Sequence, residues 1–170
     1  MAPQRKPLVP TPSETQDQLQ KLATAARTLN DLSDQLSQRV AEIEIAVCKL
    51  NLGIRAFVVA ETSSAEDGMR SHCVRLAFDK HAGRWGFQVE ELTENLNYPD
   101  MDEYQVWPFK DAPRDYRLKA VVRIPELLDA LVTKSAEVAS DITERVGYAE
   151  QIVAALTPQR PEDSKKRASK

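Results

Sequence analysis

The chain has few of the residues on which enzyme and cofactor sites are usually built. Its 170 residues include only two histidines, two cysteines and five glycines. No glycine-rich phosphate loop, dinucleotide-binding fingerprint, Gly-x-Ser-x-Gly or His-Glu-x-x-His motif occurs in it. These absences argue against nucleotide binding, acyl transfer and zinc-dependent hydrolysis, so we expect neither a catalytic residue nor a cofactor.

The histidines and cysteines are not spaced for metal binding. Cys48 and Cys73 fall in different predicted elements, which is typical of small apolar side chains in a reducing cytosol. His72 and His81 fall near opposite ends of a predicted hairpin, about 25–30 Å apart at about 3.3 Å per residue. Two such histidines cannot share a metal ion within one chain. The acidic segment 100–103 lacks the spacing of a calcium loop and is interpreted as solvated.

Long apolar runs are also absent. No run approaches the roughly 20 residues of a transmembrane helix, and no apolar stretch follows the basic pair at the N-terminus. We therefore expect a cytoplasmic protein that does not associate with a membrane. Residues 1–12 and 158–170, rich in proline and charge, are expected to be a disordered leader and a basic disordered tail.

The charge is unevenly distributed. Residues 1–12 carry +2 and residues 158–170 carry +3, which leaves −8 on the body within a total of −3. An acidic body argues against a nucleic-acid-binding face on the folded part. Binding through the basic tails remains open, and with it an alternative function as a nucleic-acid-associated regulator.

What the chain does contain is an unbroken heptad pattern. Small or apolar residues recur at spacings of three and four through five heptads: Leu19, Leu22, Ala26, Leu29, Ser33, Leu36, Val40, Ile43, Val47 and Leu50. The pattern predicts a helix over 13–52, with Gly53 as its C-terminal stop. At 1.5 Å per residue, this helix would be about 60 Å long.

The heptad residues form a candidate oligomer seam. The d positions begin at Leu22, and the a positions begin at Leu19. Further apolar residues such as Leu32 flank the seam, so the stripe favours a three- or four-helix bundle over a two-stranded zipper, which remains an alternative. The residues expected in the seam are Leu19, Leu22, Leu29, Leu36, Val40, Ile43, Val47 and Leu50.

From residue 54 the apolar period changes to two, which predicts an antiparallel meander of three or four strands over 54–109. Its clearest part is a hairpin whose apolar residues alternate with others along both strands: Val74, Leu76 and Phe78, then Trp85, Phe87 and Val89. A loop over 80–83 would place Phe78 opposite Trp85. The other face carries Arg75, Arg84, Gln88 and Glu90 and is expected to be solvated.

The remaining elements are helical. A short helix over 113–123 and a long helix over 125–156 are predicted within the segment 113–156. The expected fold is a single α+β domain over 13–157. It comprises a long N-terminal heptad helix, a three- to four-stranded meander, a short helix, and a long C-terminal helix packed antiparallel on the first.

Five residues mark a possible partner surface: Arg75, Arg84, Arg114, Tyr116 and Arg117. The two hairpin arginines could join the nearby aromatic residues in a platform for stacking bases, although core packing of those aromatics is the simpler interpretation. The other three open the short helix. There they form either a contact site or an ordinary amphipathic first turn with local ion pairs.

The leading hypothesis is a non-enzymatic interaction, scaffold or adaptor protein. It would self-associate through its long helices and present the small sheet to an unknown protein partner. Because the longer helix overhangs the shorter one around Leu19, Leu22 and Leu29, we expect a homo-oligomer, most simply a two-fold dimer. An enzyme with a site formed across subunits remains a further alternative.

Overall fold

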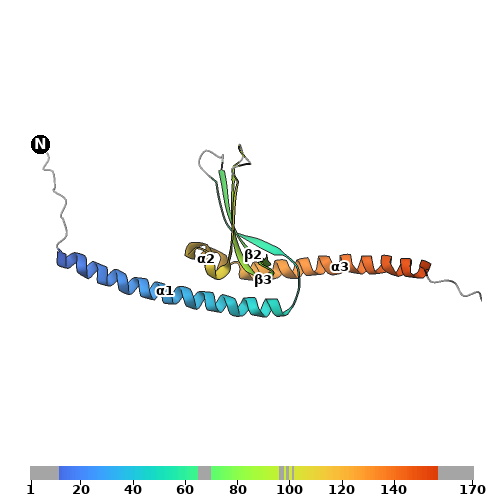
Figure 1. Ribbon diagram of the computed structural model, residues 1–170, viewed down its shortest axis with the longest axis horizontal. Helices are drawn as coiled ribbons and strands as arrows, with labels where there is room; N and C mark the ends of the chain where they lie inside the picture. The colour runs from blue at the N-terminus through green and yellow to red at the C-terminus, as the bar shows by residue number, and fades with distance from the viewer. Residues whose placement is uncertain (1–11, 65–69, 96–97, 99, 101, 157–170) are drawn as a thin grey trace, which may run out of the picture.

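The chain folds into a small α+β head from which two long helices extend (Figure 1). The computed structural model describes residues 12–64, 70–95, 98, 100 and 102–156. The elements are α1 (Pro12–Lys49), β1 (Ala56–Ser64), β2 (Arg70–His81), β3 (Arg84–Asn95), β4 (Glu103–Pro108), η2 (Phe109–Asp111), α2 (Arg114–Val121) and α3 (Ile124–Leu156). The predicted α+β class and order of elements are confirmed. The predicted tail, and the leader up to residue 11, lie outside the described residues.

The four strands form one antiparallel meander in the order β1-β2-β3-β4. One face of this sheet carries the apolar core, because the alternation of each strand directs its apolar residues to the same side. The helices cover this face and add their own apolar side chains. The buried residues of the cluster include Val40, Val47, Val74, Leu76, Phe78, Phe87, Val89, Ala120, Leu127 and Leu131.

The hairpin between β2 and β3 has the predicted faces but a different register. Phe78 pairs with Phe87, Leu76 pairs with Val89, and Trp85 lies opposite Lys80. The turn is shorter than expected because Ala82 and Gly83 both have positive φ angles, 48° and 84°. Two such residues form the tight turn that matches the twist of paired strands. The register prediction was therefore wrong, although each strand kept its buried side.

The expected antiparallel packing of the C-terminal helix on the first is not what the structure shows. α1 packs on β3, whereas α3 packs on β1 and β2. Both helices run in the same direction, and they leave the head at opposite ends (Figure 1). Strands lie about 4.8 Å apart, so a four-stranded face is wide enough for each helix to bury its apolar residues on the sheet. The two helices therefore do not need to bury them on one another.

α1 has no glycine or internal proline, and Pro12 occupies its first position, where a missing N–H costs nothing. The helix ends at Lys49, and Asn51 and Gly53 then adopt left-handed φ angles of 50° and 63°. The chain turns there into β1. None of the helices described is both long enough and apolar enough to cross a membrane.

Candidate interaction surfaces

α1 packs on the head with a face that differs from the a/d face predicted from its heptads. The residues Ser33, Val40 and Val47 are buried, at 9%, 2% and 6% exposure. Between them, Ser37 and Glu44 are partly buried. These residues occupy a and e positions of the heptads, so the face packed on the head is centred between a and e rather than between a and d.

Polar contacts fix α1 on the head. The Arg117 guanidinium of α2 donates hydrogen bonds to Ser37 Oγ at 2.6 Å and Ser33 Oγ at 2.9 Å. Farther along, the Phe87 N–H donates to Glu44 Oε2 at 2.7 Å. A Cβ atom on Gly86 would lie 3.2 Å from the Glu44 carboxylate, so this close approach favours glycine. The helix is thus held in place at both ends of its buried face.

The d row of α1, which Leu50 continues just past the end of the helix, remains largely outside these contacts. Leu22 is 65% exposed, Leu29 is 50% exposed and Leu50 is 66% exposed. Ile43 is 38% exposed, and Leu36 is partly buried at the edge of the core. One helix therefore presents a packed face to its own head and a row of leucines to the outside.

The structure divides the predicted oligomer seam into two groups. Val40 and Val47 lie in the core of the head, where no second copy can reach them. The remaining members are exposed or lie at the edge of the core: Leu19, Leu22, Leu29, Leu36, Ile43 and Leu50. The buried group belongs to folding, and only the exposed group is available for assembly.

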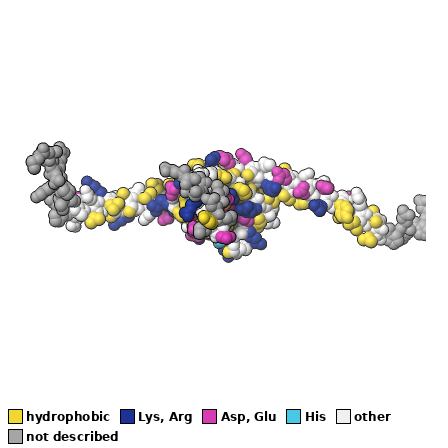
Figure 2. Space-filling view, turned by 90° about the horizontal axis from the view of Figure 1, so that it is seen from above, with side chains coloured by type: hydrophobic (Ala, Val, Ile, Leu, Met, Phe, Trp, Pro, Cys, Tyr) yellow, Lys and Arg dark blue, Asp and Glu magenta, His cyan; other side chains and the backbone are white. Residues whose placement is uncertain are grey.

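Both long helices project beyond the head as arms. Every side chain from 13 to 32 of α1 is exposed, and so is every residue from 139 to 156 of α3 except the partly buried Gly147. We call these segments the α1 arm and the α3 arm. Apolar side chains of the α3 arm include Ile142, Val146, Ile152 and Leu156. Figure 2 shows such side chains in yellow along the arms on both sides of the head.

A groove lies between α1 and α2. Its volume is about 200 Å³, and it is lined by Leu29, Leu32, Ser33, Leu36, Arg114, Arg117 and Leu118. Leu32 and Leu118 are 57% and 54% exposed. The groove thus runs beside the exposed leucines of α1 and is closed on its other side by α2.

Two arginines border this groove. Arg114 donates to Asn30 Oδ1 at 2.8 Å, and Arg117 binds the two serines described above. The Nε atoms of both arginines are buried, and neither has a hydrogen-bond partner among the described residues. The groove therefore combines an apolar lining with two positive charges whose hydrogen-bonding capacity is only partly used.

The face of the sheet opposite the core carries a network that crosses three strands. Arg55, just before β1, reaches over β2 and donates to Glu90 Oε1 of β3 at 2.8 Å, and it also pairs with Asp79. The hydrogen bond to Glu90 raises the pKa of Arg55. The Phe57 ring lies between Arg55 and Arg75, whose guanidinium carbons are 5.2 Å and 4.9 Å from its centroid.

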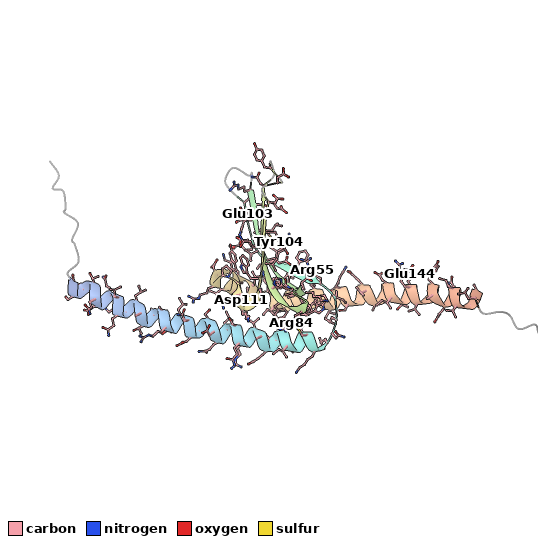
Figure 3. All side chains as sticks on the ribbon, viewed as in Figure 1. Arg55, Arg84, Glu103, Tyr104, Asp111 and Glu144 are labelled. Atoms are coloured by element: carbon pink, nitrogen blue, oxygen red, sulfur yellow. The ribbon has the colours of Figure 1, made fainter. Side chains whose placement is uncertain are left out.

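This network corrects the expectation that the outer face is solvated. Glu90 is 1% exposed and Gln88 is 4% exposed, and the Arg55 side chain reaches across β2 to Glu90. Burial, and then the nearby Glu90 carboxylate, raise the pKa of Tyr104 on β4. In Figure 3, Arg55 and Tyr104 lie on the head, away from both arms. Arg75 is the cross-strand partner of Glu90, whereas the predicted register placed Arg75 opposite Gln88.

Tyr116 of α2 belongs to a cluster with Glu91 and His72 on the sheet. Its hydroxyl donates to Glu91 Oε1 at 2.6 Å, and His72 Nε2 lies 2.8 Å from the same oxygen. The hydrogen bond to Glu91 raises the pKa of Tyr116 to about 12. Burial alone would raise the pKa of Glu91, but hydrogen bonds from Tyr116 and His72 outweigh it and lower that pKa. Tyr116 therefore ties α2 to the sheet.

The five residues of the predicted partner surface do not form one site. Arg75 lies on the outer face, and Arg84 is exposed beside the tight turn (Figure 3). Arg114 and Arg117 border the groove, and Tyr116 contacts β2 and β3. Of the four aromatics suggested for a stacking platform, Trp85, Trp107 and Phe87 lie in or against the apolar core, whereas Tyr104 is more than half exposed. This placement favours core packing over base stacking.

Within the described part of the chain, no group of three or more histidine, cysteine, aspartate or glutamate residues is placed to hold a metal ion. Comparison of the chain with family models, with curated proteins and with solved structures found no match. The function proposed below therefore depends on the surfaces just described.

Proposed function

We propose that this chain is a non-enzymatic assembly protein, a scaffold or adaptor that self-associates through its long helices and presents its sheet to a protein partner. The observation that carries this proposal is the exposed leucine row of α1. Leu22 and Leu29 are at least half exposed, whereas Val40 and Val47 farther along the same helix are already buried in the head. Large exposed apolar patches are typical of interaction sites.

Two further observations support the proposal. The α1 and α3 arms are about 30 Å and 27 Å long at 1.5 Å per residue, and they contribute no buried side chain to their own head. On the head, Phe57 and Tyr104 are 42% and 56% exposed beside the outer arginines, which suits a protein partner. A reducing, cytoplasmic environment would suit Cys48 and Cys73, since both are free.

The direct test is the mass of the full-length chain in solution. We expect light scattering at micromolar concentration to give about twice the chain mass of 19.1 kDa, the value for a dimer. Leu22→Glu should shift this mass toward the monomer, because it places a charge in the apolar contact.

Gln20→Glu is the matched control, since it adds the same charge to an exposed position on the same arm but outside the leucine row. It should leave the mass of the dimer unchanged. A wild-type chain that remains at 19.1 kDa throughout would refute the proposal.

A further inference from the structure

We infer that the groove between α1 and α2 receives the α3 arm of a second copy of this chain. The inference rests on the proposed self-association and specifies the surfaces that carry it. The groove is lined by leucines of α1 and α2, as described above, and two arginines border it. An occupant that fits should be a helix with an apolar stripe flanked by carboxylates.

The α3 arm has this character. Ile142, Val146 and Leu156 lie on one face of the helix at 3.6 residues per turn. By the same geometry, Asp141 and Glu150 lie on either side of this stripe. Between 139 and 156 the arm has three carboxylates and one arginine, a net charge of −2. None of the ion pairs found among the described residues engages these carboxylates.

The charges at the groove give a second reason. The Nε atoms of Arg114 and Arg117 are covered by the fold itself, so a docked helix does not reach them. The two guanidinium groups still place two positive charges at the groove. A carboxylate of the docked helix would lie beside opposite charge there, and charge-assisted hydrogen bonds are the stronger ones.

The course of the helices permits this contact twice in one dimer. α1 and α3 run in the same direction and leave the head at opposite ends (Figure 1). A two-fold axis perpendicular to the length of the molecule reverses the second copy. Its α3 arm then runs antiparallel along the α1 arm of the first copy, and the reverse contact forms at the other end. The 20 residues from 13 to 32 and the 18 residues from 139 to 156 are closely matched in length.

The competing arrangement pairs the two α1 arms with each other. It would bury leucines equally well, but it leaves the groove arginines without carboxylates and the apolar stripe of α3 without a cover. Charge complementarity therefore favours the α3 arm as the occupant.

The test reverses the charges on each side of the contact in the full-length chain. Arg114→Glu alters the groove, and the double variant Asp141→Arg/Glu150→Arg alters the arm. Each alone should weaken self-association about tenfold or more in sedimentation velocity, because each places like charges together. An equimolar mixture of the two variants should restore a heterodimer, because the altered groove then faces the altered arm and the unaltered groove faces the unaltered arm. Glu144→Arg, a reversal on the same arm but away from the stripe, is the control and should leave self-association unchanged.

The outcomes separate this inference from the proposed function. A monomeric wild-type chain refutes both. A wild-type dimer that Leu22→Glu dissociates but the charge variants do not would leave self-association standing and overturn the groove contact. Weakening by both variants without restoration in the mixture would also overturn it, since the two surfaces would then not meet. Leu118→Glu, on the groove wall, provides a second groove variant if Arg114→Glu does not fold, and it should also weaken self-association.

Discussion

At the scale of single residues, Glu91 shows opposing effects on one carboxylate. Burial disfavours the charged form of Glu91. Tyr116 donates a hydrogen bond to its carboxylate and His72 Nε2 lies within hydrogen-bonding distance, and the net effect lowers the pKa of Glu91. A carboxylate whose pKa is lowered by folding contributes stability above its ordinary pKa. That contribution is lost as pH falls through the lowered value.

Tyr116→Phe should therefore destabilise the head by about 1–2 kcal/mol at neutral pH, since a hydrogen bond to a charged group is lost. Without that donor the pKa of Glu91 should rise. The difference between variant and wild type should then shrink as the solution is acidified to about pH 3. Urea unfolding at both pH values and at one protein concentration measures this.

Tyr98→Phe is the control, because Tyr98 is 62% exposed and, among the described residues, its side chain makes no hydrogen bond with Glu91 or His72. It should leave the free energy of unfolding nearly unchanged at both pH values. An equal loss for Tyr116→Phe at both values would show that the lost hydrogen bond is not coupled to the charge of Glu91.

The sequence could not have predicted the roles of Glu90 and Arg55. Alternation along β3 correctly places Glu90 on the face opposite Val89, and a charged residue on that face is expected to meet water. Its burial depends on Arg55 reaching across β2, a contact between residues 35 positions apart in the chain. Periodicity gives the side of a strand on which a residue lies, but not what covers that side.

At the scale of elements, the docking of α1 on the head depends on Glu44. Its carboxylate accepts the Phe87 N–H, and Gly86 leaves room for it. Glu44→Ala should lower the free energy of unfolding by about 1–3 kcal/mol, because the N–H loses a charged acceptor. Glu44→Gln, which keeps an acceptor oxygen, should lower it less. Thermal or urea unfolding at fixed concentration measures both.

Glu42→Ala is a matched control on the same helix. Glu42 forms only an exposed pair with Arg39, whose side chain is 75% exposed, so its removal should change stability by no more than about 0.5 kcal/mol. If Glu44→Ala behaves like Glu42→Ala, the contact at Phe87 does not anchor the helix.

The elements themselves were largely predictable, whereas their pairing was not. The heptads give α1 its length, and alternation gives the strands their buried faces, because both follow from local geometry. The register of the hairpin depends on Ala82 adopting a positive φ angle, which alanine rarely does, so a longer loop was expected. The heptads likewise show that α1 is apolar along a stripe, but not that the sheet takes the a and e positions.

At the scale of the whole molecule, the division of α1 into a buried face and an exposed row separates folding from assembly. Val40 and Val47 are buried in the head, whereas Leu22 is largely exposed and Leu29 is half exposed beside the groove. The sequence predicted that the seam needs a partner but could not separate these two uses. The separation explains why Leu22→Glu should alter the mass of the assembly without unfolding the head.

The arms have a thermodynamic consequence of their own. A single helix of about 20 residues is only marginally stable in water, since most helical stability in proteins comes from packing. In an isolated copy, residues 13–32 and 139–156 have no such packing, so their backbone amides should exchange with solvent quickly. In the dimer the same amides should be protected.

Helix content should therefore fall when the protein is diluted below its dissociation constant, while the sheet of the head persists. Far-UV circular dichroism and amide hydrogen exchange across a dilution series measure this, and helicity independent of concentration would contradict it. In this chain, helix formation in the arms and association of the copies would then be one coupled equilibrium.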